Sequence, residues 1–288
     1  MNYLNLTSVT AKPTITITKD DFGKCDVTRI YWLGGAGFLI NARGTIVLID
    51  PVLKTMPGHP EQCETGPVLK IKYPIDPDDI PNVDVALYTH SDDDHLGKIT
   101  PHSLSQLKPQ MIGPPPVFEK LARMRIDIDL LTSCRSRDIF HYPNVEVEVF
   151  PADHPWQLMD PQRLDKPFRS GDAVGFLVKT PDVYCFFPGD TRLMEEHLFL
   201  KDKGIQFVVI DVSLCTYHLN PMGACTLSNL LKDAYIMPYH YGSFVDQNFP
   251  AFCGDPKTVL DEVTNGYERA LITAPGEVVE FKSGKLVR

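Results

Sequence analysis

The most informative segment of the chain reads Leu87-Tyr88-Thr89-His90-Ser91-Asp92-Asp93-Asp94-His95-Leu96-Gly97. Five potential metal ligands or proton carriers fall within its six positions 90–95. A solvated acidic turn is one interpretation, because runs of charge are usually exposed. The continuous apolar strand expected at 83–89 favours a buried site instead, since side chains at the end of such a strand are well placed to build a pocket. Burial of unpaired carboxylates is costly, so a buried cluster of this kind indicates a bound cation.

The hydrophobic pattern around this segment predicts an α/β fold. Strands are expected at 14–18, 29–33, 37–41, 45–50, 83–89, 111–113, 126–131, 145–150, 173–179, 183–187, 207–211, 235–238, 270–273 and 277–281. Helices are expected at 117–124, 193–201, 225–232 and 256–264, and the proline-rich stretch 51–82 is expected to be a long loop. Two β-rich blocks with interspersed helices predict two packed β-sheets flanked by helices, a four-layer αβ/βα arrangement. No change in composition marks a boundary, so we expect one domain over 1–288.

With its flanking segments, the 87–97 stretch resembles the metallo-β-lactamase superfamily. The superfamily signature His-x-His-x-Asp-His follows a strand, and its four ligand positions are occupied here by His90, Asp92, Asp94 and His95. Three further segments look like the branch that contains ascorbate-6-phosphate lactonase and N-acyl-phosphatidylethanolamine phospholipase D: Trp32-Leu33-Gly34-Gly35-Ala36-Gly37-Phe38-Leu39-Ile40, Val47-Leu48-Ile49-Asp50-Pro51 and Pro238-Tyr239-His240-Tyr241-Gly242-Ser243-Phe244. The family order then implies His154, Asp190 and His240 as the remaining ligands, each after an expected strand. Six segments in the family's order are strong evidence together, although each is weak alone.

The resemblance implies two divalent transition-metal ions. By position, one ion would be held by His90, Asp92 and His154 and the other by Asp94, His95 and His240, with Asp190 bridging. Asp92 stands where the family usually has histidine, and a carboxylate favours Mn(II) or Fe(II) relative to Zn(II). The resemblance therefore leaves Mn, Zn and Fe as the expected metals. Asp93 could replace Asp92 as the ligand, although alternating geometry favours Asp92.

The activity implied by the resemblance is hydrolysis of a lactone, ester or phosphodiester bond of a small molecule by hydroxide held between the two ions. Metal binding can lower the pKa of water from ~15.7 to about 7, which stabilises hydroxide by roughly 12 kcal/mol. The candidate catalytic side chains are Asp94, which is also a ligand, and His218. The candidate substrate contacts are Trp156, His218 and Tyr241; the two aromatic residues could equally be core residues, and His218 could support a ligand.

Two other functional classes share some of these features. Flavodiiron redox proteins have the same fold and place Glu at the Asp92 position, but they add a flavin domain for which this chain has no room. A metal-poor binding or regulatory protein is disfavoured, because all seven expected ligand positions carry metal-capable side chains.

Composition limits the classes of binding partner and the cellular compartment that we expect for this protein. The net charge of −9 and pI of about 5.4 disfavour nucleic acid, whose binding depends on Lys and Arg. The seven cysteines are scattered without metal-finger spacing and are expected to be reduced thiols. No secretory signal and no long apolar run is found, which predicts a cytoplasmic protein with no membrane span. A small-molecule substrate is the expected partner, and formation of a homo-oligomer stays open. Four other histidines are expected to be surface or capping residues: His59, His102, His141 and His197.

Overall fold

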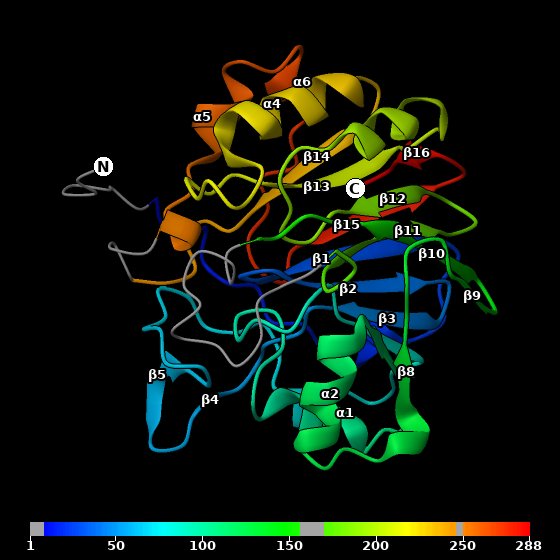
Figure 1. The fold of residues 1–288 in the computed structure, drawn as a ribbon, viewed down its shortest axis with the longest axis vertical. Coiled ribbons are helices and arrows are strands. Elements are labelled where there is room, and N and C mark those ends of the chain that lie inside the picture. Colours follow the sequence, from blue (N-terminus) through cyan, green and yellow to red (C-terminus); the bar gives the residue numbers. More distant parts are fainter. Residues whose placement is uncertain (1–8, 156–169, 246–249) are drawn as a thin grey trace.

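Two β-sheets pack face to face and carry helices on both outer faces (Figure 1). This architecture is seen in a computed structural model that describes residues 9–155, 170–245 and 250–288. Helices α1 and α2 cover the outer face of one sheet, and α4, α5 and α6 cover the outer face of the other (Figure 1). The predicted four-layer α/β arrangement is confirmed.

The first sheet has eight strands in the order β16-β15-β1-β2-β3-β6-β7-β8. Its strands from β16 to β3 are antiparallel, whereas β3, β6, β7 and β8 run parallel. The bounds are β1 Thr28–Gly34, β2 Gly37–Ala42, β3 Thr45–Ile49, β6 Val85–Leu87, β7 Gln110–Gly113, β8 Leu131–Ser133, β15 Val278–Lys282 and β16 Lys285–Leu286. Parallel pairing brings the carboxyl ends of β3 and β6 to the same edge of the sheet.

The second sheet has six strands in the order β14-β13-β12-β11-β10-β9. Here β12, β13 and β14 are parallel, and the rest are antiparallel. The bounds are β9 Ile139–Tyr142, β10 Val145–Pro151, β11 Val174–Lys179, β12 Tyr184–Phe187, β13 Phe207–Asp211 and β14 Tyr235–Tyr239. A separate hairpin is formed by β4 Thr55–Met56 and β5 His59–Cys63.

The helices are short. In the part of the chain that the structure describes, the α-helices are α1 Thr100–Ser105, α2 Pro115–Arg123, α4 Asn220–Leu230, α5 Pro256–Leu260 and α6 Gly266–Arg269. The 3-10 helices are Lys19–Phe22, Pro77–Asp79, Ile128–Leu130, Glu195–Asp202 and Pro250–Phe252. Among the helices in the described ranges, none has the length and apolar character that a bilayer span requires.

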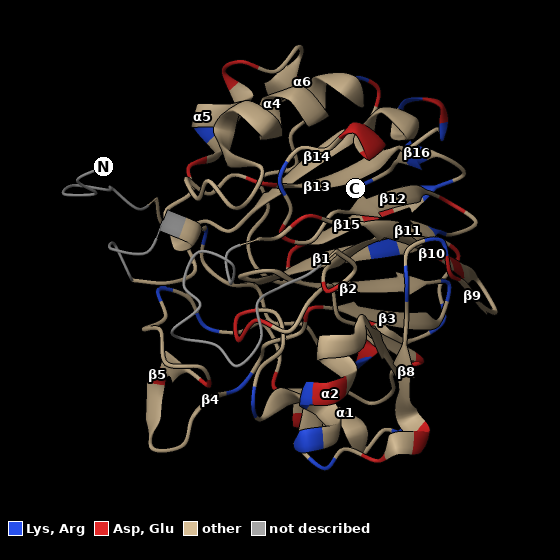
Figure 2. Ribbon diagram, viewed as in Figure 1, with Lys and Arg blue, Asp and Glu red and all other residues tan. Residues whose placement is uncertain are grey.

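Burial on both faces explains why the sheet strands read as nearly continuous apolar runs. Along β1, Ile30 and Trp32 face the core between the sheets, whereas Tyr31 and Leu33 face the core under α1 and α2. Successive side chains of a strand point to opposite faces, so one strand supplies both cores. Most of the strand ribbon is accordingly free of charge, and charged residues gather on loops and helices (Figure 2).

Several elements differ from the sequence prediction. Residues 14–18 are extended but form no strand, because the Ile15 amide donates to Pro275 and the Ile17 amide donates to Pro74, two separate segments. The expected strand 270–273 is reduced to a single bridge between Ala270 and Ile236. Apolar, β-branched composition predicted a strand in both places, but no continuous partner strand within the described residues lies beside either segment.

Other elements begin or end elsewhere than predicted. The strand 83–89 is reduced to Val85–Leu87, and the helix 256–264 ends at Leu260. The expected strand 126–131 opens as the 3-10 helix Ile128–Leu130 and becomes a strand only at Leu131. The expected helix 193–201 is the 3-10 helix Glu195–Asp202, and the helix expected at 225–232 begins at Asn220. The long loop 51–82 contains the β4–β5 hairpin.

Candidate metal centre

The predicted ligands come together at one edge of the molecule, where strands of both sheets end. Residues 90–95 follow β6 of the eight-stranded sheet. The other three ligands follow strands of the six-stranded sheet: His154 after β10, Asp190 after β12 and His240 after β14. The site is therefore assembled from both sheets.

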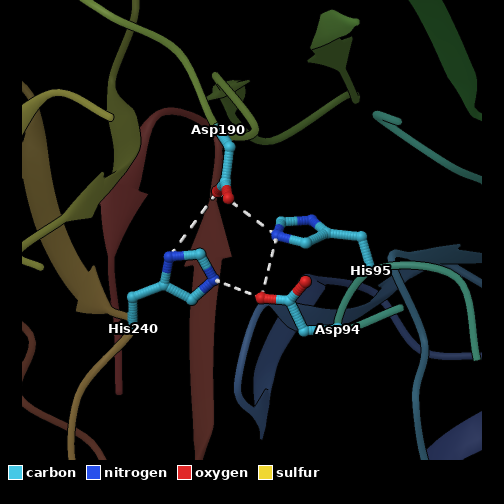
Figure 3. Close-up of side chains that lie close together, drawn as sticks. All are labelled: Asp94, His95, Asp190 and His240. Carbon is cyan, nitrogen blue, oxygen red and sulfur yellow. Dashed lines mark ion pairs between the residues drawn. The ribbon is translucent and has the colours of Figure 1, made fainter. Parts of the chain in front are cut away.

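One group of side chains comprises Asp94, His95, Asp190 and His240, whose candidate ligand atoms all lie within 4.8 Å of one another. The four side chains point toward a common centre, with the two carboxylates between the two imidazoles (Figure 3). His95 Nε2 lies 3.2 Å from Asp190 Oδ1 and 3.9 Å from Asp94 Oδ2. His240 Nε2 lies 3.9 Å from the same Asp94 oxygen. These residues are the ones that the resemblance assigns to the second ion.

A second group contains His90, His154 and Asp190, again with ligand atoms within 4.8 Å. Asp92 Oδ2 adjoins it, 3.1 Å from His154 Nε2 and 3.5 Å from His90 Nε2. Asp93 points elsewhere and pairs with Lys120 at 2.8 Å and with Lys98 at 3.0 Å. Asp92 rather than Asp93 is thus the carboxylate beside the two histidines.

Asp190 belongs to both groups and to a third one, which it forms with Asp211, His218 and His240. Its Oδ1 lies nearest His95, whereas its Oδ2 lies 3.9 Å from His90 Nε2. Oδ2 also lies 3.1 Å from His218 Nε2, which is its nearest partner in the site. The bridging role of Asp190 stays a prediction.

Charges in the site stabilise one another. Burial alone would raise the pKa of Asp190, but the neighbouring His218, His95 and His240 hold it well below its usual value. Burial alone would lower the pKa of His95, but Asp190, Asp50 and Asp94 raise it well above its usual value. The pKa of His154 is lowered, chiefly by burial. Asp190 is thus ionised, which is the state in which a carboxylate binds metal.

The donor set fits a divalent transition metal. His95 Nε2, His240 Nε2 and Asp190 Oδ1 are buried, and among the described residues none of these atoms makes an aligned hydrogen bond. Buried polar atoms without hydrogen bonds are costly. Imidazole nitrogens and carboxylate oxygens are the ligands that Zn, Mn and Fe accept in proteins, so bound metal would satisfy these atoms.

Asp50 and Thr89 position His95, in the part of the site that follows β6. Asp50 accepts hydrogen bonds from the Thr89 amide at 2.7 Å, from Thr89 Oγ1 at 2.6 Å and from His95 Nδ1 at 2.8 Å. Asp50 was not among the predicted site residues. Its position at the end of β3, directly before Pro51, was the available indication.

Asp211 and His218 contact the site from the side of the six-stranded sheet, next to Asp190. His218 Nε2 lies 3.1 Å from Asp190 Oδ2, and His218 Nδ1 lies 2.7 Å from Asp211 Oδ2. The structure thus places His218 against the predicted bridging ligand. Asp211 was also absent from the predicted site residues. It is the last residue of β13, and the ends of strands are where the other site residues were expected.

Two aromatic residues, Tyr241 and Trp156, were predicted to contact the substrate. Tyr241 is buried and its ring stacks on Trp32 with a centroid distance of 5.1 Å. Its ring is part of the core between the sheets, which favours the packing alternative. Trp156 lies outside the described residues.

His197 is buried rather than on the surface, and its Nδ1 caps the Met194 amide at 3.0 Å. The capping part of that expectation is confirmed. Its surroundings contain Phe150 and Phe186 rather than the metal-site residues.

Comparisons with known proteins agree with this fold and site. A family model described as a beta-lactamase superfamily domain matches residues 45–241, more than half of the chain. A UPF0173 metal-dependent hydrolase of Pyrococcus furiosus is 25% identical over 260 residues, which cover 88% of this chain and 100% of that protein. Igni18, a metallo hydrolase from Ignicoccus hospitalis, has a TM-score of 0.64 at 16% identity, covering 89% of this chain and 99% of its own.

CmlA, a diiron beta-hydroxylase from Streptomyces venezuelae, has a TM-score of 0.63 at 17% identity, with 90% of this chain and 54% of CmlA covered. At such identities the two solved structures show the fold alone. The family model, together with the buried histidine and aspartate residues at the expected strand ends, decides the classification: the chain belongs to the metallo-β-lactamase superfamily.

Proposed function

We propose that the protein is a hydrolase that uses two divalent transition-metal ions to cleave a lactone, ester or phosphodiester bond of a small molecule. The observation that carries the proposal is the position of Asp190, whose two carboxylate oxygens face two separate groups of histidines and aspartates. The metal-dependent hydrolase name of the Pyrococcus furiosus relative supports it. The choice of bonds rests on the resemblance to the lactonase and phospholipase D branch.

Bound ions would supply Lewis-acid chemistry and make hydroxide available near neutral pH. His90, Asp92 and His154 would hold one ion, Asp94, His95 and His240 the other, and Asp190 would serve both. The carboxylate of Asp92 makes the ligand set of His90, Asp92 and His154 harder than three imidazoles would be, which favours Mn(II) or Fe(II).

His218 is the proposed proton carrier. Its Nε2 lies 3.1 Å from Asp190 Oδ2, so a proton held on this nitrogen is within the site. A general acid at this point would protonate the leaving oxygen as the bond to it breaks. Asp94 is the proposed second catalytic side chain, acting as a ligand whose Oδ2 lies between His95 and His240.

A redox function is the second candidate, because Asp92 supplies a carboxylate where flavodiiron proteins have Glu; CmlA, which shares the fold, is described as a diiron beta-hydroxylase. A hydrolase needs only a redox-inert ion, whereas an oxygen-activating site must cycle iron between oxidation states. Metal replacement therefore distinguishes the two functions.

The test is to remove metal from the protein, restore Mn(II), Zn(II) or Fe(II) separately, and assay a panel of lactones, phosphodiesters and acyl esters. We expect the Mn(II) or Zn(II) form to hydrolyse at least one member of the panel without flavin or electron donor. His240→Ala should abolish this turnover and keep the circular dichroism spectrum of the parent. His141→Ala, which removes an exposed histidine on β9, is the matched control and should keep full activity. Activity confined to the iron form with a reductant would replace the hydrolase with the redox function.

A further inference from the structure

Asp211 is a fully buried carboxylate that contacts two histidines at once. Its Oδ2 lies 2.7 Å from His218 Nδ1 and 3.1 Å from His240 Nδ1, and its Oδ1 accepts the Ser213 amide at 2.7 Å. Exposure is 0% for Asp211, 4% for His218 and 2% for His240. Three donors thus converge on one carboxylate where β13 ends.

These contacts decide which nitrogen of each imidazole faces the metal site. An ionised carboxylate can only accept hydrogen bonds, so both Nδ1 atoms must carry the proton and donate to Asp211. The Nε2 atoms then face the site, although His240 Nδ1 also lies 3.5 Å from Asp190 Oδ1. His218 Nε2 lies 3.1 Å from Asp190 Oδ2, and His240 Nε2 lies 3.9 Å from Asp94 Oδ2.

We propose that Asp211 is the positioning residue that fixes His218 and His240 together, with both Nε2 atoms facing the metal site. The inference rests on the proposed function, and it adds that the predicted metal ligand His240 and the predicted proton carrier His218 share one anchor. A carboxylate that accepts the second N–H of a metal-bound histidine fixes the ring and makes it a better ligand. Sharing means that a change at Asp211 disturbs metal binding and proton transfer at the same time.

Asp211→Asn tests this with a side chain of nearly the same size. If the amide oxygen replaces Oδ2, the amide NH2 faces the Ser213 N–H, and two donors meet. If the amide is reversed, its NH2 faces both imidazoles and the protons must move to the Nε2 atoms. Neither orientation can satisfy all three contacts.

The matched control is Asp182→Asn. Asp182 is 1% exposed and accepts hydrogen bonds from Arg43 and from the Ser283 amide, but it lies before β12 begins, at the opposite end of that strand from Asp190. It therefore reports what loss of a buried carboxylate does to the fold alone.

The readouts are metal affinity, by competition with a chelator, and imidazole protonation, by long-range ¹H–¹⁵N NMR of the metal-free protein. Removing such an anchor typically weakens metal binding by about 10–100-fold, and we expect this for Asp211→Asn and parental affinity for Asp182→Asn. In the metal-free parent, His218 and His240, assigned with His218→Asn and His240→Asn, should both be protonated at Nδ1.

Parental metal affinity in a folded Asp211→Asn protein would overturn the inference. If that variant does not fold, the parent decides: imidazoles of His218 and His240 protonated only at Nε2 would overturn it equally. A parent protein that binds no metal would remove the proposed function, yet its NMR spectrum would still show whether Asp211 holds the two rings.

Discussion

Gly189 allows the Asp190 segment to approach Thr89 closely, and Gly189→Ala is the most direct test of this packing. Gly189 has φ +63°, and a Cβ there would lie 2.7 Å from Thr89 Cβ. Thr89 has little room to move, because its amide and hydroxyl both donate to Asp50 at 2.7 and 2.6 Å.

The expected loss has two parts. A left-handed conformation costs an L-residue roughly 1–2 kcal/mol, and the stiffer unfolded chain returns about 0.4–1 kcal/mol. Displacing Thr89 also costs a hydrogen bond to a charged group, about 1.5–3 kcal/mol. We therefore expect Gly189→Ala to lower the free energy of unfolding by about 3 kcal/mol in total.

The control is Gly204→Ala. Gly204 has φ +70° but no atom within 4 Å of its ideal Cβ position, so only the conformational cost applies. Its expected loss is about 1 kcal/mol. Urea unfolding of both metal-free variants, followed by circular dichroism, measures the difference. Equal losses would show that the close approach of Gly189 to Thr89 contributes nothing, and the reasoning would fail.

Three further perturbations test the site and the opposite end of the sheets. Asp190→Ala should lose both metal ions and Asp92→Ala chiefly one, as elemental analysis would measure; equal loss would contradict the bridging role of Asp190. Asp92→His should raise the ratio of zinc-supported to manganese-supported activity, and an unchanged ratio would refute the ligand-hardness argument. Asp182→Asn should destabilise the fold by about 2 kcal/mol at pH 7, because hydrogen bonds to a charged group are lost. Burial alone would raise the pKa of Asp182, but Arg43, Ser283 and Thr28 lower it. The contribution of Asp182 is therefore full above the unfolded pKa of about 3.9, and the difference between variant and parent should shrink as unfolding is measured at lower pH.

The sheets could largely be predicted from the sequence because their strands are buried on both faces. The runs at β1, β2, β3, β13 and β14 are apolar and bounded by glycine, proline or polar turns, so local pattern and tertiary burial agree. Residues 14–18 show why other segments failed. Their alternating pattern is that of a strand, but pairing depends on a partner segment, which a local pattern does not report.

The candidate site could be predicted from the sequence for a related reason. Ligands at strand ends lie in short polar interruptions of apolar runs, so His90 to His95 and His240 stand out. Asp50 and Asp211 have the same strand-end position, but as single aspartates they resemble ordinary turn residues. Their importance depends on the imidazoles that fold onto them, at 2.8 Å for His95 and 2.7 Å for His218.

The supply of ligands by both sheets has a mechanical consequence. Ions bound to residues 90–95 on one side and to His154, Asp190 and His240 on the other would act as crosslinks between two layers that are otherwise joined mainly by apolar packing. A crosslink at one edge restrains the two sheets from sliding or opening there, and it restrains the opposite edge less. Metal occupancy should therefore slow amide hydrogen exchange most in β6, β10, β12 and β14, the strands that lead into the site, and affect the β15–β16 turn little.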